Sequence, residues 1–233
     1  MVTTVRAAHG SRPAPRQTGF NSPPLVRWLA SLGQAGGAPA TPNPAERLSQ
    51  WLDWTDAIAL SAVLNAAPSP QTISAVPAPS HSPHDACLQV RRDLARAIGQ
   101  DAALRAEAAN AHPADQSRFA PYRTHCRALQ RKMESRIGAL RVEVRAALAT
   151  RSAALAQLAA LDAVMDQALA ARAQHLLSTL PALLEQQFNR LPDDQRAGFH
   201  QQVQRVLLAE LDMRLQPIDG LLEALGPAPT RHP

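Results

Sequence analysis

A long run of the chain repeats apolar residues every three or four positions. The run extends from about Ala114 to Thr179, and its one proline, Pro121, stands near its start. Its apolar positions are Phe119, Tyr122, Cys126, Leu129, Met133, Ile137, Leu140, Val144 and Leu148, then Leu155, Leu158, Leu161, Met165, Leu169, Leu176 and Leu180. This spacing is that of a helix and not of a strand, so it predicts one continuous rod over residues 114–180. Such a rod would be roughly 100 Å long, which favours a helical hairpin or coiled-coil-like arm.

Shorter helical patterns flank the rod. Residues Leu25 to Leu32 form an amphipathic segment ended by Gly33, and Asn43 followed by Pro44 predicts the start of a second helix. In that second helix Trp51 and Trp54 are three residues apart, which favours packing anchors over a ligand pocket.

Three further helical segments follow the same rules. Asp85 is expected to cap a helix that runs to about Ala111, with Leu88 on its buried face. Beyond the rod, Pro181 restarts a helix, and residues 193–215 predict a helix that returns along the rod. Pro217 and Gly220 then bracket a last short segment.

Proline and glycine divide the chain into units. Residues 1–24 predict a disordered basic tail and 25–67 a small N-terminal helical unit. Residues 68–84 carry repeated prolines and predict a stiff linker, 85–226 form the helical domain, and 227–233 a disordered tail.

Composition narrows the fold class. Of 233 residues, 45% are apolar but only 3% aromatic, so the core must be thin and rich in alanine and leucine. No period-two alternation of β-branched residues appears, and we predict an all-α protein.

The positive charge is concentrated in two segments. The net charge is +5, yet residues 1–35 hold four arginines and no acid, and residues 115–151 hold nine bases against three acids. On a helical projection Arg123, Arg127, Arg131, Arg141 and Arg145 share an arc of about 80° over roughly 33 Å. This arginine ridge could follow a phosphate backbone. The alternative is that it pairs with acids of the returning helix (Asp193, Asp194, Glu210 or Asp212) or stays solvated.

No chemistry-bearing motif predicts an enzyme. Lys132, the only lysine, lies in mid-helix, so a P-loop is excluded, and the chain lacks hydrolase, zinc-protease and dinucleotide-binding signatures. Cys87 and Cys126 fit reduced thiols, and His81 and His84 near Cys87 are a weak match to zinc-ligand spacing. We therefore expect no metal, no cofactor, no membrane span and a cytoplasmic protein.

Two stretches carry a family resemblance. RLSQWLDWTDAIALSAVLN (Arg47 to Asn65) is the first. The second runs from Phe119-Ala120-Pro121-Tyr122-Arg123 through LQRKMESRIGALRVEVRAALA to LAALDAVMDQALAARAQHLLSTLPALLEQQFNRL. Both resemble a bacterial domain-of-unknown-function family whose members look like the accessory cytoplasmic component of type III Zorya-like anti-phage defence systems. The resemblance implies protein partners, a MotA/TolQ-like and a MotB/OmpA-like motor subunit, and supplies no catalytic residue.

Three hypotheses follow. The first is a non-enzymatic interaction protein of such a system, which self-associates through the rod. Its residues for helix packing or partner contact would be Trp51, Trp54, Phe119, Tyr122, Leu129, Met133, Leu140 and Val144. The second is a non-specific nucleic-acid binder that uses the five arginines of the ridge. The third is a helical effector enzyme of unfamiliar geometry.

Overall fold

The computed structural model describes residues 23–33, 53–66, 82–100 and 119–226, and every regular element within those ranges is helical. The all-α prediction is therefore confirmed. The elements are α1 (Pro24–Gly33), α3 (Trp54–Asn65), α4 (Pro83–Gly99), α6 (Ala120–Ala149), α7 (Ala153–Ser178), α8 (Leu180–Arg190), the short 3₁₀ helix η2 (Asp193–Gly198) and α9 (Phe199–Leu225). The predicted terminal tails, apart from Pro23 and Pro24, and most of the proline-rich linker lie outside the described residues.

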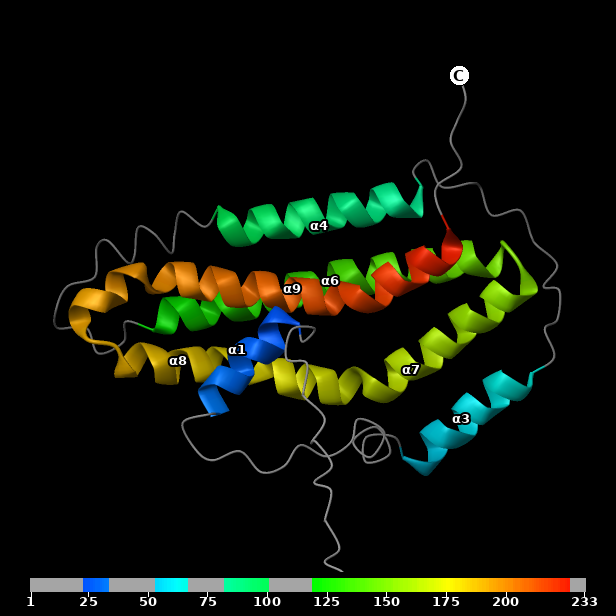
Figure 1. Ribbon diagram of the computed structural model, residues 1–233, viewed down its shortest axis with the longest axis horizontal. Coiled ribbons are helices and arrows are strands. Elements are labelled where there is room, and N and C mark those ends of the chain that lie inside the picture. Colours follow the sequence, from blue (N-terminus) through cyan, green and yellow to red (C-terminus); the bar gives the residue numbers. More distant parts are fainter. Residues whose placement is uncertain (1–22, 34–52, 67–81, 101–118, 227–233) are drawn as a thin grey trace, which may run out of the picture.

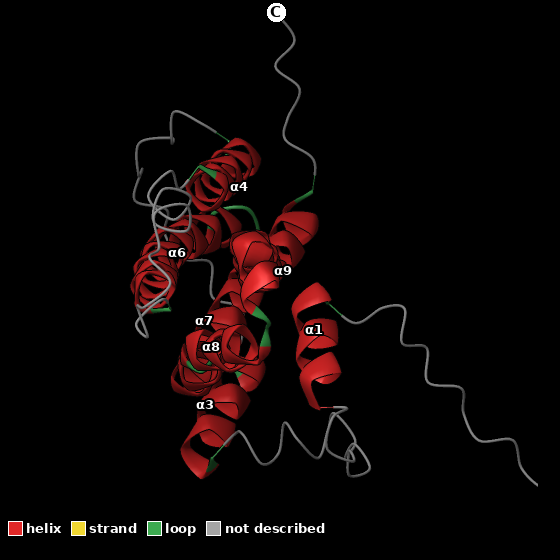
Figure 2. Ribbon diagram, turned by 90° about the vertical axis from the view of Figure 1, so that its left-hand side faces the viewer, coloured by secondary structure: helices red, strands yellow, loops and turns green. Residues whose placement is uncertain are grey.

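The helices form an elongated bundle. Helices α4, α6 and α9 run side by side, and α7 leaves the far end of α6 and returns obliquely beneath them (Figure 1). Helix α8 continues the return, α1 crosses α9, and α3 lies against α7 (Figure 2). The N-terminal unit thus packs on the rest of the chain through α1 and α3.

The continuous rod predicted over 114–180 is wrong, because the helix breaks at residues 150–152. Helix α6 ends at Ala149, and the Ser152 hydroxyl caps α7 by accepting a hydrogen bond from the Leu155 amide at 3.2 Å. The chain reverses there, so α6 and α7 pack on each other. The coiled-coil arm stays a prediction.

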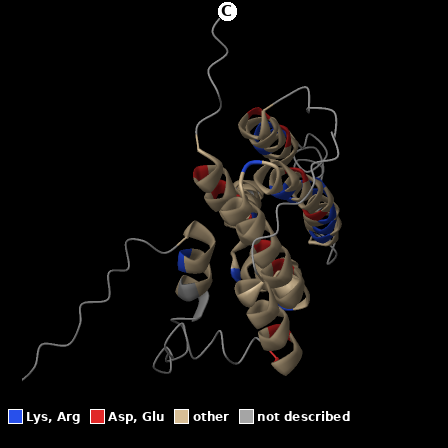
Figure 3. Ribbon diagram, turned by 90° about the vertical axis from the view of Figure 1, so that its right-hand side faces the viewer, with Lys and Arg blue, Asp and Glu red and all other residues tan. Residues whose placement is uncertain are grey.

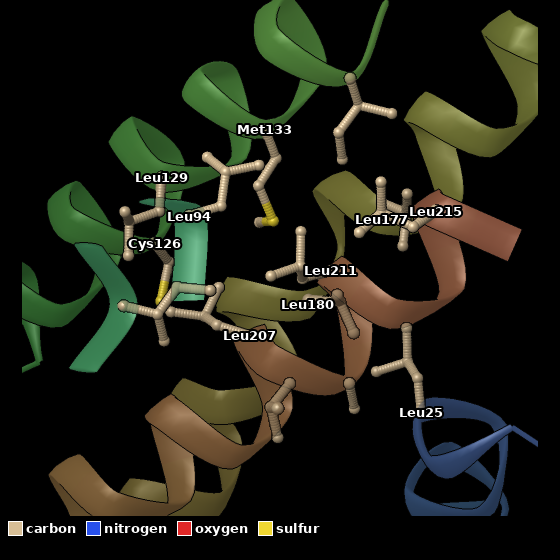
Figure 4. Packing of buried hydrophobic residues seen from close by; sticks show 14 of the residues in the cluster. Leu25, Leu94, Cys126, Leu129, Met133, Leu177, Leu180, Leu207, Leu211 and Leu215 are labelled. Atoms are coloured by element: carbon tan, nitrogen blue, oxygen red, sulfur yellow. The ribbon is translucent and has the colours of Figure 1, made fainter. Parts of the chain in front are cut away.

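The apolar stripe of α6 is the centre of the core. Its buried apolar residues are Tyr122, Cys126, Leu129, Met133, Ile137, Leu140, Val144 and Leu148, with Phe119 just before the helix. They meet Leu94 from α4, Leu177 and Leu180 from α7 and α8, and Leu207, Leu211 and Leu215 from α9 (Figure 4). The period of three to four residues therefore identified the core face of α6 correctly. In α7 the register differs, since Leu177 is buried and Leu176 is 51% exposed.

An aromatic cluster closes the end of the bundle where α6 begins. Phe119, Tyr122, Phe188 and Phe199 have ring centroids 5.1 to 6.2 Å apart. The chain has four phenylalanines and one tyrosine in all, so this end takes most of them. Edge-on and offset ring contacts add to the burial and join α6, α8 and α9.

Helix α4 is held to the bundle by apolar contacts and ion pairs. It begins earlier than predicted: the Ser82 hydroxyl is the cap, accepting from the Asp85 amide at 3.1 Å, and Pro83 is the first helical residue. Leu94 and Ile98 are buried, whereas Leu88 is 52% exposed and does not face the core.

The ion pairs of α4 reach both neighbouring helices. Arg91 pairs with Asp219 at 2.7 Å and with Asp212 at 3.1 Å on α9, while Asp93 pairs with Arg136 on α6 at 3.4 Å. Asp212, one of the acids expected beside the arginine ridge, is therefore engaged with α4 instead.

Two helix ends differ from their predictions. The predicted start at Asn43 and residue Trp51 lie outside the described residues, and α3 is capped by a reciprocal pair of hydrogen bonds between Asp53 and Asp56. Pro217 does not end the returning helix but lies within α9 on its exposed side. The helix ends instead at Leu225, and the next residue, Gly226, has a φ of 79° that suits the absence of a side chain.

Candidate functional site

The arginine ridge of α6 is divided by the fold into paired and unpaired members. Arg141 and Arg145 lie opposite Asp162 and Asp166 of α7. The Nε atoms of the two arginines donate to the same Asp162 oxygen, Oδ2, at 2.9 Å and 2.6 Å. The side chains of both arginines and of Asp162 are 12–17% exposed. This four-residue cluster, the hairpin clamp, fastens α7 to α6.

The hairpin clamp sets the charge state of its carboxylate. Burial alone would raise the pKa of Asp162, but hydrogen bonds from both arginines more than offset this and lower the pKa below its ordinary value. The pKa of Arg145 is raised because its hydrogen bonds to the two carboxylates outweigh burial. Asp162 and Arg145 are thus held in their charged forms.

Arg123, at the other end of the ridge, forms an ion pair with Glu185 of α8. Pairing with acids of a neighbouring helix therefore holds for Arg123, Arg141 and Arg145. The acids differ from those expected, since they belong to α7 and α8. Glu210 of α9 pairs with Arg214 instead. The side chain of Asp193 lies outside the described part of the structure.

Arg127 and Arg131 are the exposed members of the ridge. Neither forms an ion pair with any residue in the described ranges, and both line a groove between α6, α7 and α9. Figure 3 shows how the blue lysine and arginine segments gather on the side of the bundle where α6 and α4 lie. The phosphate-contacting surface considered for the whole ridge is thereby reduced to this short part of α6.

A buried polar network lies beneath that groove, and sequence reasoning missed it. Glu210 is fully buried, and burial raises its pKa despite the attraction of Arg214. The Gln130 side-chain amide donates to Glu210 at 3.1 Å and to the Leu177 carbonyl at 2.9 Å. A signal was present: Glu210 follows Val206 and Leu207 at helical spacing within the apolar stripe of α9, where a carboxylate must find a partner.

Exposed apolar side chains gather on α3, and we refer to Trp54, Ile58 and Leu64 as the α3 apolar face. They are 80%, 54% and 59% exposed. Trp54 is therefore not an anchor of the core, contrary to the packing interpretation. The C-terminal end of α3 is fixed to α7, since the Gln157 side-chain amide donates to the Val63 and Leu64 carbonyls at 3.2 Å.

Helix α7 is apolar yet little buried. Ala159 and Leu177 are its buried residues, and most of its leucines are only half-buried. Among the described residues, the stretch Ala153–Arg190 is long and apolar enough to cross a membrane by length and composition, and an 18-residue window within it has a mean hydropathy of 1.2. It contains Asp162 and Asp166, and their pairs with α6 join it to the bundle.

The described residues hold no group of three or more His, Cys, Asp and Glu placed to bind a metal ion. Cys87 and Cys126 are free and buried, and His81 lies outside the described residues. Burial, with a smaller contribution from the negative charge of Glu210, raises the pKa of Cys126 to about 12, so this thiol stays protonated and unreactive at neutral pH.

The profile of a protein family described as "Protein of unknown function (DUF3348)" matches residues 12–198 and 197–227. No curated protein and no solved structure matches the chain.

Proposed function

We propose that this chain, which belongs to the DUF3348 family of proteins of unknown function, is a non-enzymatic interaction protein. A helix of a partner protein docks on its α3 apolar face. The main support for this proposal is that Trp54 is 80% exposed and that Ile58 and Leu64 on the same helix are exposed as well. The helix itself is held to the bundle by a hydrogen bond from Gln157. Exposed apolar side chains gathered on one helix of a bundle are typical of contact surfaces.

The character of this face fits an apolar helix as partner. Helix α3 carries Asp56 as its only charged residue, and that carboxylate closes the helix cap. The neighbouring carboxylates of α7 are neutralised by the hairpin clamp. An apolar partner helix would therefore bury tryptophan and aliphatic surface here without desolvating an unpaired charge.

The identity of the partner rests on the resemblance of the Arg47–Asn65 and Phe119–Leu191 stretches to accessory components of type III Zorya-like systems. We propose on that basis that the protein works in the cytoplasm with a MotA/TolQ-like and a MotB/OmpA-like motor pair in anti-phage defence. The first of these stretches contains the whole of α3, including all three residues of the α3 apolar face.

The experiment is co-purification of the tagged chain with the motor pair encoded nearest to it, followed by phage plating. The test variant is Trp54→Ser with Ile58→Ser. The matched control is Leu88→Ser, which removes a side chain of similar exposure from α4. We expect the double variant to lose the motor subunits and phage resistance, and the control to keep both. Equal retention by the two variants would refute docking at α3, and normal resistance after deletion of the gene would refute the defence role.

The nucleic-acid hypothesis retains one supporting observation, the exposure of Arg127, Arg131 and Lys132. Titration of duplex DNA binding against salt tests it. A binder that neutralises several phosphates shows a steep loss of affinity with salt, and glutamine at Arg127, Arg131 and Lys132 should reduce that loss. A shallow salt dependence in the unmodified protein would rule this function out.

A further inference from the structure

The groove between α6, α7 and α9 has an unusual lining. It is lined by Thr124, Arg127, Gln130, Arg131, Glu134, Gln174, Ser178 and Arg214, with a volume of about 450 Å³. Every lining side chain is polar or charged, whereas small-molecule pockets are mostly apolar. The volume lies within the range of sites for small ligands. A charged, hydrogen-bonding ligand is the kind that such a lining can hold.

We propose that this groove binds a small phosphorylated ligand of nucleotide size, with its phosphate oxygens held by Arg127, Arg131 and Arg214. Three guanidinium groups outnumber two carboxylates, Glu134 in the lining and the buried Glu210 beneath it, so the groove is electropositive. Planar guanidinium donors match phosphate oxygens and can bind them in pairs. The Thr124 and Ser178 hydroxyls and the Gln174 amide add neutral donors around them.

The floor of the groove is built in advance. Arg214 donates from Nε to Glu210 Oε1 at 2.8 Å, and its Nη2 lies 2.8 Å from the same oxygen. Glu210 is fully buried and is also bound by Gln130. Arg214 is thus held in place by two of its nitrogens, and its Nη1 group remains for a ligand. A preorganised donor loses less conformational freedom on binding than a mobile surface arginine.

The site is compact because the rest of the ridge is already engaged. Arg123 pairs with Glu185, and Arg141 and Arg145 belong to the hairpin clamp. Arg127 and Arg131 are four residues apart, which is about 6 Å along a helix. That span suits one or two adjacent phosphate groups and not the long backbone track of a duplex.

Calorimetric titration with ATP and with inorganic pyrophosphate, on the full chain at moderate salt, tests the proposal. We expect saturable binding of at least one of them. Arg127→Gln and Arg131→Gln should each weaken it by about tenfold or more, the factor for losing charge-assisted hydrogen bonds to phosphate. The affinity of Arg131→Lys should lie between those of the unmodified protein and Arg131→Gln. Lysine keeps the positive charge but lacks the planar guanidinium group that can bind two phosphate oxygens at once.

The matched control is Lys132→Gln, which removes the same charge from an exposed neighbour that does not line the groove. Its binding should equal that of the unmodified protein. Circular dichroism confirms that each variant is folded, and because all three side chains are exposed we expect no loss of helix. The proposal is overturned if neither probe binds, if Lys132→Gln weakens binding as much as the groove variants, or if duplex DNA displaces ATP and binds more tightly. Since α3 is not involved, failure here leaves the proposed docking function standing.

Discussion

The sharpest consequence of the fold concerns Asp162, the shared carboxylate of the hairpin clamp. Replacing Asp162 with Asn removes the negative charge that Arg141 and Arg145 both contact. The size of the side chain is nearly unchanged. All three side chains are 12–17% exposed, so the arginines cannot be fully rehydrated without moving α7. Breaking a buried ion pair typically costs 3–5 kcal/mol, but Asp166 still reaches both guanidinium groups. We therefore expect a loss of about 2–3 kcal/mol in the free energy of unfolding.

The matched control is Asp166→Asn. The Asp166 carboxylate contacts the same two arginines, but its side chain is 40% exposed. An exposed pair contributes at most about 1 kcal/mol, so this variant should be clearly milder. Urea unfolding followed by circular dichroism measures both. Since about 1 kcal/mol shifts the melting temperature of a chain of this size by roughly 2–4 °C, thermal melts should separate the variants. Equal losses, or a loss below about 0.5 kcal/mol for Asp162→Asn, would refute the clamp.

Three further outcomes follow from the structure. Met133→Ala removes a fully buried side chain from the centre of the core and should lower the free energy of unfolding by about 2–5 kcal/mol in urea titrations, and a loss below about 1 kcal/mol would contradict its placement. Trp54→Ser should change the free energy of unfolding by less than about 0.5 kcal/mol, because the ring is 80% exposed, and a larger loss would mean that it packs in the fold. Glu210 has a raised pKa in the folded state, so between its ordinary pKa and the raised one the folded chain binds more protons and stability falls as pH rises. Glu210→Gln should flatten this fall in urea titrations across that pH window, and an unchanged slope would contradict the burial of the carboxylate.

The local fold was predictable wherever one apolar face decides it. The stripe from Tyr122 to Leu148 identified the buried side of α6, and Gly33 marked the end of α1. Burial of a continuous apolar stripe is the main free-energy contribution that stabilises such a helix. The helical period of the apolar residues is therefore visible in the sequence.

The hairpin turn could not be predicted from that period. Leu148 and Leu155 are seven residues apart, two helical turns, so the apolar spacing continues undisturbed across the break. Residues 150–152 contain neither proline nor glycine, and the only sign is Ser152, a good helix cap that helices also tolerate inside. The helix propensities of these residues are too weak to determine whether the helix continues or breaks here. The packing of α6 against α7 determines it.

The partners of the arginine ridge depended on that turn. In a straight helix Arg141 and Asp162 would be about 31 Å apart and could not interact. Once the chain reverses at residues 150–152, the two side chains meet. Pro217 shows a similar dependence on context, because its ring is tolerated within α9 on a side that faces solvent.

The distance between Glu134 on α6 and Gln174 on α7 tests the central claim, that the basic helix is folded back against α7 to form the clamp and the groove. Both residues line the groove and are exposed, and the native cysteines are buried, so spin labels can be attached at cysteines introduced there. Double electron–electron resonance should give a distance between the two spin labels below about 25 Å. Packed helices lie roughly 8–10 Å apart, and each label adds its own length. A continuous rod would place the two sites about 60 Å apart, and a distance of that size would contradict the account.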